Sequence, residues 1–195
     1  MPPKIILASN SPGRKMLFEK YFKDFLIIPS NFDENKIKEN DPIKLTELLA
    51  FKKCEEVAKN NPFDFVFAFD TVVLCENHII GKPQDRDDAR NMLKFLSGKK
   101  QIVISGYSFA LYHKNIISRG HEKTILYFDR LTDAFIEEYI NTHDVLKYAG
   151  GYAIQENDRF LTIKKGDIDV VIGAPMKKVK EFLLKNKYWL WTFDF

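Results

Sequence analysis

The sequence predicts an α/β fold with a mixed, twisted sheet flanked by helices. Strand-like and helix-like segments alternate along the 195 residues, without a repeat or a low-complexity tract. The run at 65–69 is wholly apolar, as in a strand that is covered on both faces. Hydrophobic residues make up 45% of the chain and 17 residues are phenylalanine, which favours a folded globule with a sizeable core. We expect one domain over residues 1–195.

Apolar runs and capping residues position the elements of the first seventy residues. Ser11 and Asp41 suit helix N-caps, and each precedes a proline, which suits the first helical position. The helix that follows Asp41 carries apolar residues on one face. The expected elements are strands over 4–8, 25–29 and 65–69, helices over 12–22 and 42–59, and a polar loop over 30–41.

The same signals order the rest of the chain. Glu76-Asn77 lies between two short apolar runs, which predicts a hairpin, and Asp85 and Thr132 suit N-caps. The expected elements are strands over 72–75, 78–80, 101–112, 116–128, 152–154, 160–163 and 169–172, and helices over 85–96, 132–141 and 175–186. The aromatic segment 188–195 is expected to pack on the domain or on a partner, because so much apolar surface is seldom left in water.

Composition argues against several functional classes. With 30 basic and 27 acidic residues, the net charge of +3 does not favour nucleic acid as a partner. No apolar run approaches the roughly 18–20 residues of a membrane span, and no secretory signal is expected before the first strand. Cys54 and Cys75 lie in apolar surroundings, so we expect reduced, buried thiols and a cytoplasmic protein. The four histidines show no zinc-ligand spacing.

The segment L-A-S-N-S-P-G-R-K at 7–15 joins the first expected strand to the first helix. Several groups that can contact an anion converge at this junction: the hydroxyls of Ser9 and Ser11, the free helix amides and the cations Arg14 and Lys15. It suits an anion such as phosphate, because free N–H groups and the positive end of the helix dipole face the ligand. A capped helix with ordinary surface cations explains the junction equally well.

Two acidic and two basic residues complete a candidate site. Asp70 follows the buried strand 65–69, at the end of which α/β sheets bind ligands, although turn carboxylates are also common there. Glu34 in the polar loop, Lys53 on the long helix and Lys82 in a Gly-Lys-Pro turn each fit an ordinary exposed position as well.

Taken together, these residues suit the cleavage of a polyphosphate. Donors and positive charge come from Ser9, Arg14, Lys53 and Lys82. Asp70 and Glu34 supply the oxygen ligands that Mg²⁺ or Mn²⁺ prefers alongside substrate phosphates. Cations and metal neutralise the charge of the transition state, and a carboxylate or the metal activates the attacking water.

Several motifs resemble those of the Maf-like nucleoside triphosphate pyrophosphatases, in the same order and over about residues 5–184. L-A-S-N-S-P-G-R resembles the L-A-S-x-S-P-R-R of that family, and F-D-T-V-V at 69–73 resembles A-D-T-V-V. Gly81-Lys82-Pro83 matches directly. The other matching segments are 89–98, Leu131-Thr132, 149–155 and 173–175.

This resemblance implies a two-lobed α/β fold around a deep cleft, usually as a homodimer. It implies metal-assisted hydrolysis of a nucleoside triphosphate to the monophosphate and pyrophosphate. Asp70 would be the base for water attack on the α-phosphorus, with Glu34 as its partner for the metal or the water. The triphosphate would be held by residues of the junction and by two lysines: Ser9, Ser11, Arg14, Lys15, Lys53 and Lys82.

The resemblance also implies a base preference. Gly13, Thr71 and Gln155 fall at positions that bear on specificity, and the Thr71–Gln155 pair resembles the branch that takes dTTP and UTP. The same chemistry on 7-methyl-GTP or another purine nucleotide is one alternative. A non-catalytic nucleotide-binding regulator of cell division is another.

Five positions depart from the family pattern. Gly13 replaces the first arginine of S-P-R-R, so one cation is missing beside Arg14, although Lys15 could substitute for it. The other departures are Phe69 for alanine, Gln101 for histidine, Asp129 for arginine and Tyr148 for lysine. They leave the preferred nucleotide open.

Overall fold

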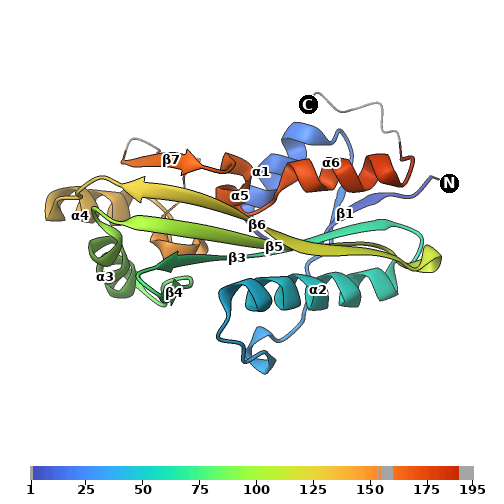
Figure 1. Cartoon of the computed structure of the whole chain (residues 1–195), viewed down its shortest axis with the longest axis horizontal. Coiled ribbons are helices and arrows are strands. Elements are labelled where there is room, and N and C mark those ends of the chain that lie inside the picture. The colour runs from blue at the N-terminus through green and yellow to red at the C-terminus, as the bar shows by residue number, and fades with distance from the viewer. Residues whose placement is uncertain (1, 153, 155–159, 189–195) are drawn as a thin grey trace. The chain divides into compact units, whose positions relative to one another are not determined.

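A computed structural model describes residues 2–152, 154 and 160–188. The expected position of Gln155 and the aromatic segment beyond Tyr188 therefore lie outside the described residues. The elements along the chain are β1 (Ile5–Leu7), α1 (Pro12–Tyr21), β2 (Leu26–Ile27), η1 (Glu34–Lys36), α2 (Pro42–Asn60), β3 (Phe65–Cys75), β4 (His78–Ile80), α3 (Arg86–Leu96), β5 (Lys100–Leu111), η2 (Tyr112–Lys114), β6 (Ile116–Phe128), α4 (Asp133–Thr142), η3 (Val145–Lys147), η4 (Ala149–Gly151), β7 (Leu161–Lys165), α5 (Ile168–Ile172) and α6 (Met176–Lys185) (Figure 1).

The predicted α/β class with a mixed sheet is confirmed. In the described part of the chain, seven strands form one sheet in the order β2-β1-β3-β5-β6-β7, with β4 paired to β3. β1 pairs in parallel with β2 and β3, whereas the pairs β3–β4 and β6–β7 are antiparallel. No helix among the described residues has both the length and the apolar character needed to cross a membrane.

The chain divides into two compact units, and three of the boundaries between them fall within the strands β3, β5 and β6. The first unit comprises Met1–Asp70, Ser105–Glu122 and Gly173–Phe195, and the second comprises Thr71–Ile104 and Lys123–Ile172. Each unit has a hydrophobic core of its own. The core of the second unit joins α3 and α4 to the sheet through residues such as Leu93, Ile136 and Leu126.

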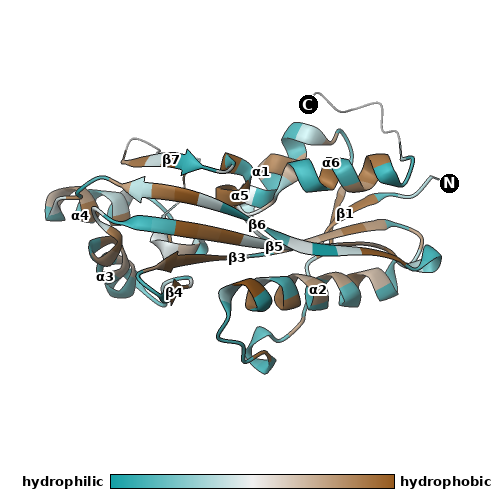
Figure 2. Cartoon of the chain, viewed as in Figure 1, coloured by the Kyte–Doolittle hydropathy of each residue, from teal (hydrophilic) through white to brown (hydrophobic). Residues whose placement is uncertain are grey.

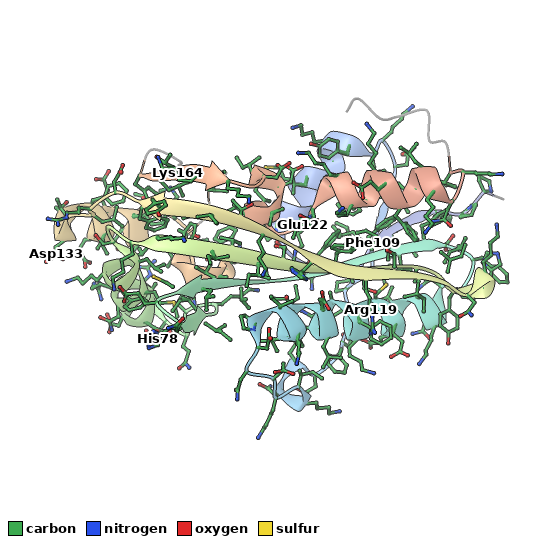
Figure 3. All side chains as sticks on the ribbon, in the orientation of Figure 1. His78, Phe109, Arg119, Glu122, Asp133 and Lys164 are labelled. Carbon is green, nitrogen blue, oxygen red and sulfur yellow. The ribbon has the colours of Figure 1, made fainter. Side chains whose placement is uncertain are left out.

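In the first unit, odd-numbered residues of β3 face α1 and α6. The ring of Phe67 lies 5.9 Å from that of Phe18 on α1 and 6.0 Å from that of Phe182 on α6. Phe69 lies 6.0 Å from Phe18, and the ring of Phe109 on β5, labelled in Figure 3, lies 5.1 Å from that of Phe67. Figure 2 shows the resulting hydrophobic character along β3. These rings fill one side of the sheet.

Even-numbered residues of β3 face the opposite side, because successive side chains of a strand alternate. Val66 and Ala68 pack there against Cys54 and Val57 of α2. Asp70 is also even-numbered, so its carboxylate lies on the same side as Val66 and Ala68. It points toward α2 and not into the aromatic cluster. The alternation of β3 thus separates the aromatic cluster from the candidate site.

Helix α2 approaches the sheet closely at one glycine. A Cβ atom on Gly106 of β5 would lie 2.3 Å from the backbone carbonyl of Thr46, and 2.7 Å from the next backbone nitrogen. Only glycine permits this contact, since backbone atoms cannot move aside as a flexible side chain can. Gly106 therefore fixes the distance between α2 and the sheet.

The predicted helix starts are confirmed. Ser11 accepts a hydrogen bond from the Arg14 amide, and Asp41 accepts from two amides of α2. Asp85 and Thr132 cap α3 and α4 in the same way. The expected hairpin turn at Glu76-Asn77 is also present, with φ of 47° and 67°, as a two-residue turn of this type requires.

Two strand predictions are wrong. Residues 169–172 form the short helix α5, where the Asp167 carboxylate accepts a hydrogen bond from the Asp169 amide at 3.2 Å and satisfies one free amide at the helix start. Near 152–154, Tyr152 lies outside any strand and Ile154 lies in a turn, while residue 153 is not among the described residues.

The surroundings of Asp70 also differ from the prediction. The expected strands 65–69 and 72–75 are one continuous strand, β3, so Asp70 lies within a strand and not at its end. β1 pairs with β3 over Phe65–Phe67 only. The carboxylate lies beyond this pairing, where β3 continues past the end of its neighbour.

Candidate functional site

The loop between β1 and α1 presents a buried hydroxyl. Ser9 is 9% exposed, and its Oγ accepts hydrogen bonds from the Ser11 amide and from Arg14 Nη1, both at 3.2 Å. A hydroxyl has two acceptor lone pairs and one proton. With both lone pairs engaged, the Ser9 hydroxyl can take part in a further hydrogen bond only as a donor.

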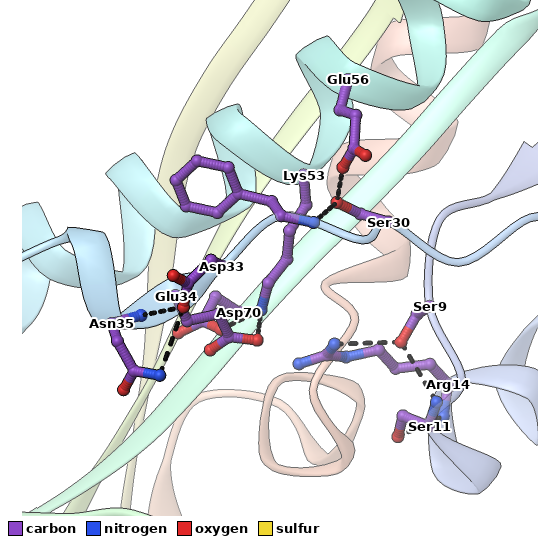
Figure 4. Close-up of polar contacts among 11 residues, drawn as sticks. Ser9, Ser11, Arg14, Ser30, Asp33, Glu34, Asn35, Lys53, Glu56 and Asp70 are labelled. Atoms are coloured by element: carbon purple, nitrogen blue, oxygen red, sulfur yellow. Dashed lines mark hydrogen bonds and ion pairs between the residues drawn. The ribbon is translucent and has the colours of Figure 1, made fainter.

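Arg14 is held by two contacts on its guanidinium. Nη1 donates to Ser9 (Figure 4), and Nε donates to the Gly173 carbonyl at 2.9 Å. Burial lowers the pKa of Arg14, and the carboxylates of Asp70 and Glu34 oppose that shift. The guanidinium remains charged, as arginine does in proteins. Its orientation is therefore set by contacts within the protein.

Gly173 is a site residue whose role the sequence did not reveal. Its φ is +107°, a backbone conformation that side-chain-bearing residues rarely adopt. That conformation places the carbonyl on Arg14, whose position in the chain is 159 residues away. The Gly-Ala-Pro segment was a visible motif, but no local signal linked it to the arginine.

The ammonium of Lys53 lies between two carboxylates. Nζ is 2.7 Å from Asp70 Oδ1 and 2.9 Å from Glu34 Oε1. The Lys53 and Asp70 side chains are 13% and 11% exposed, whereas that of Glu34 is 55% exposed. A buried ion pair is thus joined to a carboxylate that reaches into solvent. Figure 4 shows the Arg14 guanidinium directed toward this group.

The electrostatics favour Asp70 as a proton acceptor. Burial raises the pKa of its carboxyl, and the nearby Glu34 carboxylate raises it further. The cations Lys53 and Arg14 lower the pKa and partly offset the effect of burial. A carboxylate with a raised pKa is a stronger base than an ordinary aspartate, which suits general base catalysis near neutral pH.

Helix α2 also anchors the loop that carries Glu34. Ser30 Oγ donates to the Glu56 carboxylate on α2, and the Phe32 amide donates to Ser30 Oγ at 3.0 Å (Figure 4). Asp33 then caps η1 by accepting from the Asn35 amide at 3.1 Å. Sequence reasoning did not identify Ser30 or Glu56, since a serine in a loop and a glutamate on a helix are ordinary.

The other expected site residues lie on several different elements. Lys15 forms an exposed i,i+4 ion pair with Glu19, 3.6 Å long, and Gly13 is buried in the first turn of α1. Thr71 is half-buried on β3, and Lys82 is exposed after β4, both in the second unit. Their predicted roles, like that of Gln155, stay predictions.

Two departures from the family pattern have structural explanations. Phe69 is fully buried among aromatic rings on the side of β3 away from Asp70, so it serves packing. Gln101 is also fully buried, and its Oε1 accepts from the Tyr152 hydroxyl at 3.1 Å. Phe69 is therefore part of the hydrophobic core, whereas Gln101 is a buried polar residue that contacts Tyr152 through Oε1.

Asp70 and Glu34 fit a divalent cation. Both carboxylates contact one ammonium, so two oxygen donors from two elements converge on one cationic group. Mg²⁺ typically takes one or two carboxylates and completes its shell with water and phosphate oxygens. Among the described residues there is no cluster of three His, Cys, Asp or Glu side chains that could hold an ion without a substrate.

Comparison with protein families gives one family, described as "Maf-like protein", which matches residues 4–186. A protein of Thermosipho africanus named dTTP/UTP pyrophosphatase is 44% identical over 92% of this chain and 92% of its own length. A protein of Pyrococcus furiosus with the same name is 41% identical over 89% of this chain and 90% of its own length.

Among solved structures, the Staphylococcus aureus Ham1 protein is similar in fold. The similarity has a TM-score of 0.54 and covers 94% of this chain and 99% of that one, at 14% sequence identity. It supports the arrangement of helices around the mixed sheet.

Proposed function

We propose that this chain, which belongs to the Maf-like protein family, hydrolyses dTTP and UTP to the monophosphate and pyrophosphate. The contact between Lys53 and Asp70, with Arg14 directed toward it, is the observation that carries this proposal. It combines a buried base with fixed cations, as the attack of water on a polyphosphate requires. The names of the relatives with 41% and 44% identity support the same substrates.

The junction of β1 and α1 binds the triphosphate in this proposal. Ser9 donates its hydroxyl proton to a phosphate oxygen, and Arg14 supplies fixed positive charge. The free amides at the start of α1 face the same anion. Lys53 and Lys82 add further charge, and Lys53 exchanges its carboxylate contacts for phosphate contacts as the substrate binds.

Asp70 accepts the proton of the attacking water. The water oxygen bonds to the α-phosphorus, the bond from that phosphorus to its bridging oxygen breaks, and pyrophosphate leaves. The burial that raises the Asp70 pKa makes this proton transfer more favourable. Lys53 stabilises the carboxylate before the reaction and keeps it oriented.

We propose Mg²⁺ or Mn²⁺ as the cofactor, held by Asp70 and Glu34 together with substrate phosphates. When bound, such an ion neutralises phosphate charge and lowers the pKa of a coordinated water. The exposed position of Glu34 allows it to bind an ion that enters with the nucleotide.

The base of the nucleotide is selected at Thr71 and Gln155 in this proposal. A glutamine amide offers both a donor and an acceptor, which matches the edge of a pyrimidine. The reaction takes place in the cytoplasm, since Cys54 and Cys75 are buried free thiols, as in proteins of a reducing compartment.

The test is pyrophosphate release from UTP, dTTP, CTP, GTP, ATP and 7-methyl-GTP, with Mg²⁺ or Mn²⁺. We expect turnover on UTP and dTTP, its loss on addition of EDTA, and a decrease of about 10²–10⁴-fold in Asp70→Asn. Asp24→Asn, at an exposed position, is the control that should keep full activity. Turnover confined to 7-methyl-GTP or other purines contradicts the base preference, and no turnover on any nucleotide contradicts the reaction.

A further inference from the structure

Lys82 is exposed, whereas the backbone on both sides of it is fixed. The Gly81 carbonyl accepts a hydrogen bond from the Gly150 amide at 2.9 Å. Pro83 is buried, and its ring fixes its own φ at about −65°. A residue that precedes a proline is also confined largely to extended backbone conformations. The contact between Gly81 and Gly150 therefore joins the turn that carries Lys82 to η4, a distant segment of the chain.

Gly150 makes this contact in an unusual backbone conformation. Its φ is +76°, which L side chains rarely adopt. A Cβ atom at this position would lie 2.7 Å from Cε1 of Tyr152, so the Tyr152 ring lies directly against the backbone of Gly150. The next residue, Gly151, lies against α3, since a Cβ atom there would be 3.6 Å from that of Ala89. η4 is thus in contact with both the Tyr152 ring and α3.

The Tyr152 side chain is itself anchored to two strands of the second unit. Its hydroxyl donates to Oε1 of Gln101 on β5 at 3.1 Å, and its ring lies 4.7 Å from that of Phe128 on β6 in an edge-to-face contact. Tyr152 is 5% exposed. Burial raises the pKa of its hydroxyl, so the hydroxyl remains a donor to Gln101. The position of the ring is therefore set by the sheet.

We propose that Tyr152 is a positioning residue for Lys82. The ring of Tyr152 holds Gly150, and the Gly150 amide holds the Gly81 carbonyl. The next residue in the chain is Lys82. This inference rests on the function proposed above, in which Lys82 adds positive charge to the triphosphate site. Because a lysine side chain is long and flexible, a fixed backbone limits where its ammonium can lie and lowers the entropy that is lost when it binds a phosphate.

The first test is the steady-state kinetics of UTP hydrolysis in Tyr152→Leu, which removes both the ring and the hydroxyl. We expect KM to rise about tenfold while kcat changes little, because a displaced Lys82 weakens a charged contact to the substrate. Tyr152→Phe keeps the ring against Gly150 and should recover most of the affinity. Tyr139→Leu makes the same change at another buried tyrosine of the same core and should leave KM unchanged. An unchanged KM in Tyr152→Leu, or an equal rise in Tyr139→Leu, overturns the proposal.

A double-mutant cycle distinguishes action through Lys82 from a general loss of packing. Lys82→Met alone should raise KM for UTP, and addition of Tyr152→Leu should then cause little further change. The reason is that the group that Tyr152 positions is already absent. If Tyr152→Leu raises KM by the same factor with and without Lys82, the two residues act independently and the proposal is wrong.

Amide hydrogen exchange of the full chain gives a readout that needs no turnover. The Gly150 amide should exchange many-fold faster in Tyr152→Leu than in the unmodified chain. The Ala89 amide, which donates to the Asp85 carbonyl at the start of α3, should exchange at an unchanged rate. Equal acceleration of both amides indicates general opening of the unit and overturns the proposal. Absence of nucleotide hydrolysis in the unmodified chain contradicts the proposed function instead, and the exchange rates then still show whether Tyr152 fixes the turn of Lys82.

Discussion

Lys53 and Asp70 form a buried ion pair with a distance of 2.7 Å between Nζ and Oδ1, and the same ammonium lies 2.9 Å from Glu34. One cation therefore orients the proposed base and the proposed metal ligand together. Three residues further along the same helix, Glu56 anchors the loop that leads to Glu34. Helix α2 is thus the element that assembles the carboxylates of the site.

Lys53→Met should lower kcat/KM for UTP by about 10²–10³-fold. The substitution removes one preorganised charge from the site and leaves Asp70 buried without its closest partner. Lys53→Arg should retain part of the activity, because it keeps the charge. Lys59→Met on the same helix removes only an exposed ion pair with Glu55 and serves as the control. Similar kinetics for Lys53→Met and Lys59→Met would contradict the role of Lys53.

The fall of kcat/KM at acidic pH should follow the protonation of the Asp70 carboxylate. A base must be deprotonated to act, so kcat/KM falls as pH decreases through its pKa. Since burial raises the Asp70 pKa, kcat/KM should fall at a higher pH than the protonation of an ordinary aspartate would cause. Glu34→Gln removes a carboxylate that raises the pKa, so this fall should move to lower pH in the residual activity. A shift in the opposite direction would exclude Asp70 as the titrating group.

Ser30→Ala should weaken the use of metal more than the binding of nucleotide. The hydroxyl joins the loop of Glu34 to Glu56, and loss of a partner that orients a metal ligand typically lowers affinity or activity by about 10–100-fold. The measurement is the concentration of Mn²⁺ that gives half-maximal rate, compared with KM for UTP. Ser30→Thr keeps a hydroxyl and should restore the metal dependence. A parallel change in both constants would argue against a positioning role.

Gly173→Ala should affect stability and substrate affinity together. An L side chain at a φ of +107° introduces backbone strain of about 1–3 kcal/mol, and a shifted carbonyl would release Arg14. We expect a lower Tm and a KM for UTP that rises about tenfold. Gly98→Ala, at a φ of +70° in the second unit, is the control for strain, because a Cβ there would meet only the flexible Arg130 side chain at 3.3 Å. It should lower the Tm without raising KM.

The two thiols should be unreactive in the folded protein. Cys54 and Cys75 are each 1% exposed, and burial raises the pKa of the Cys54 thiol to about 12. A thiol reacts through its thiolate, which a raised pKa keeps scarce at pH 8. A disulfide exchange reagent at pH 8 should therefore react with neither thiol until denaturant is added, and then with both. Rapid reaction of either thiol in the native protein would contradict this burial.

Local features were predictable because they depend on neighbouring residues. Ser11, Asp41, Asp85 and Thr132 cap the predicted helices, since a capping side chain bonds to amides only two or three residues away. The hairpin at Glu76-Asn77 follows from the tolerance of asparagine for positive φ. The junction after β1 was predicted as a candidate anion site for the same local reasons.

Errors arose where surroundings outweighed local preference. The β-branched residues of 169–172 favoured a strand, yet Asp167 starts a helix there. Asp70 was expected at a strand end because a charged residue interrupts an apolar run. In the structure, β3 continues through it, since an ion pair compensates the carboxylate.

The sequence by itself determined the α/β class, the helix starts, the hydroxyl and arginine of the first junction, and the motifs that resemble one family. Only the tertiary structure decided which charges meet. Lys53 lies 17 residues from Asp70, and Arg14 lies 159 residues from the carbonyl that holds it. Such pairs depend on how closely α1 and α2 approach the sheet. Gly106 and the aromatic rings set these distances through packing. Packing joins residues that are far apart in the chain, so no short stretch of sequence encodes it.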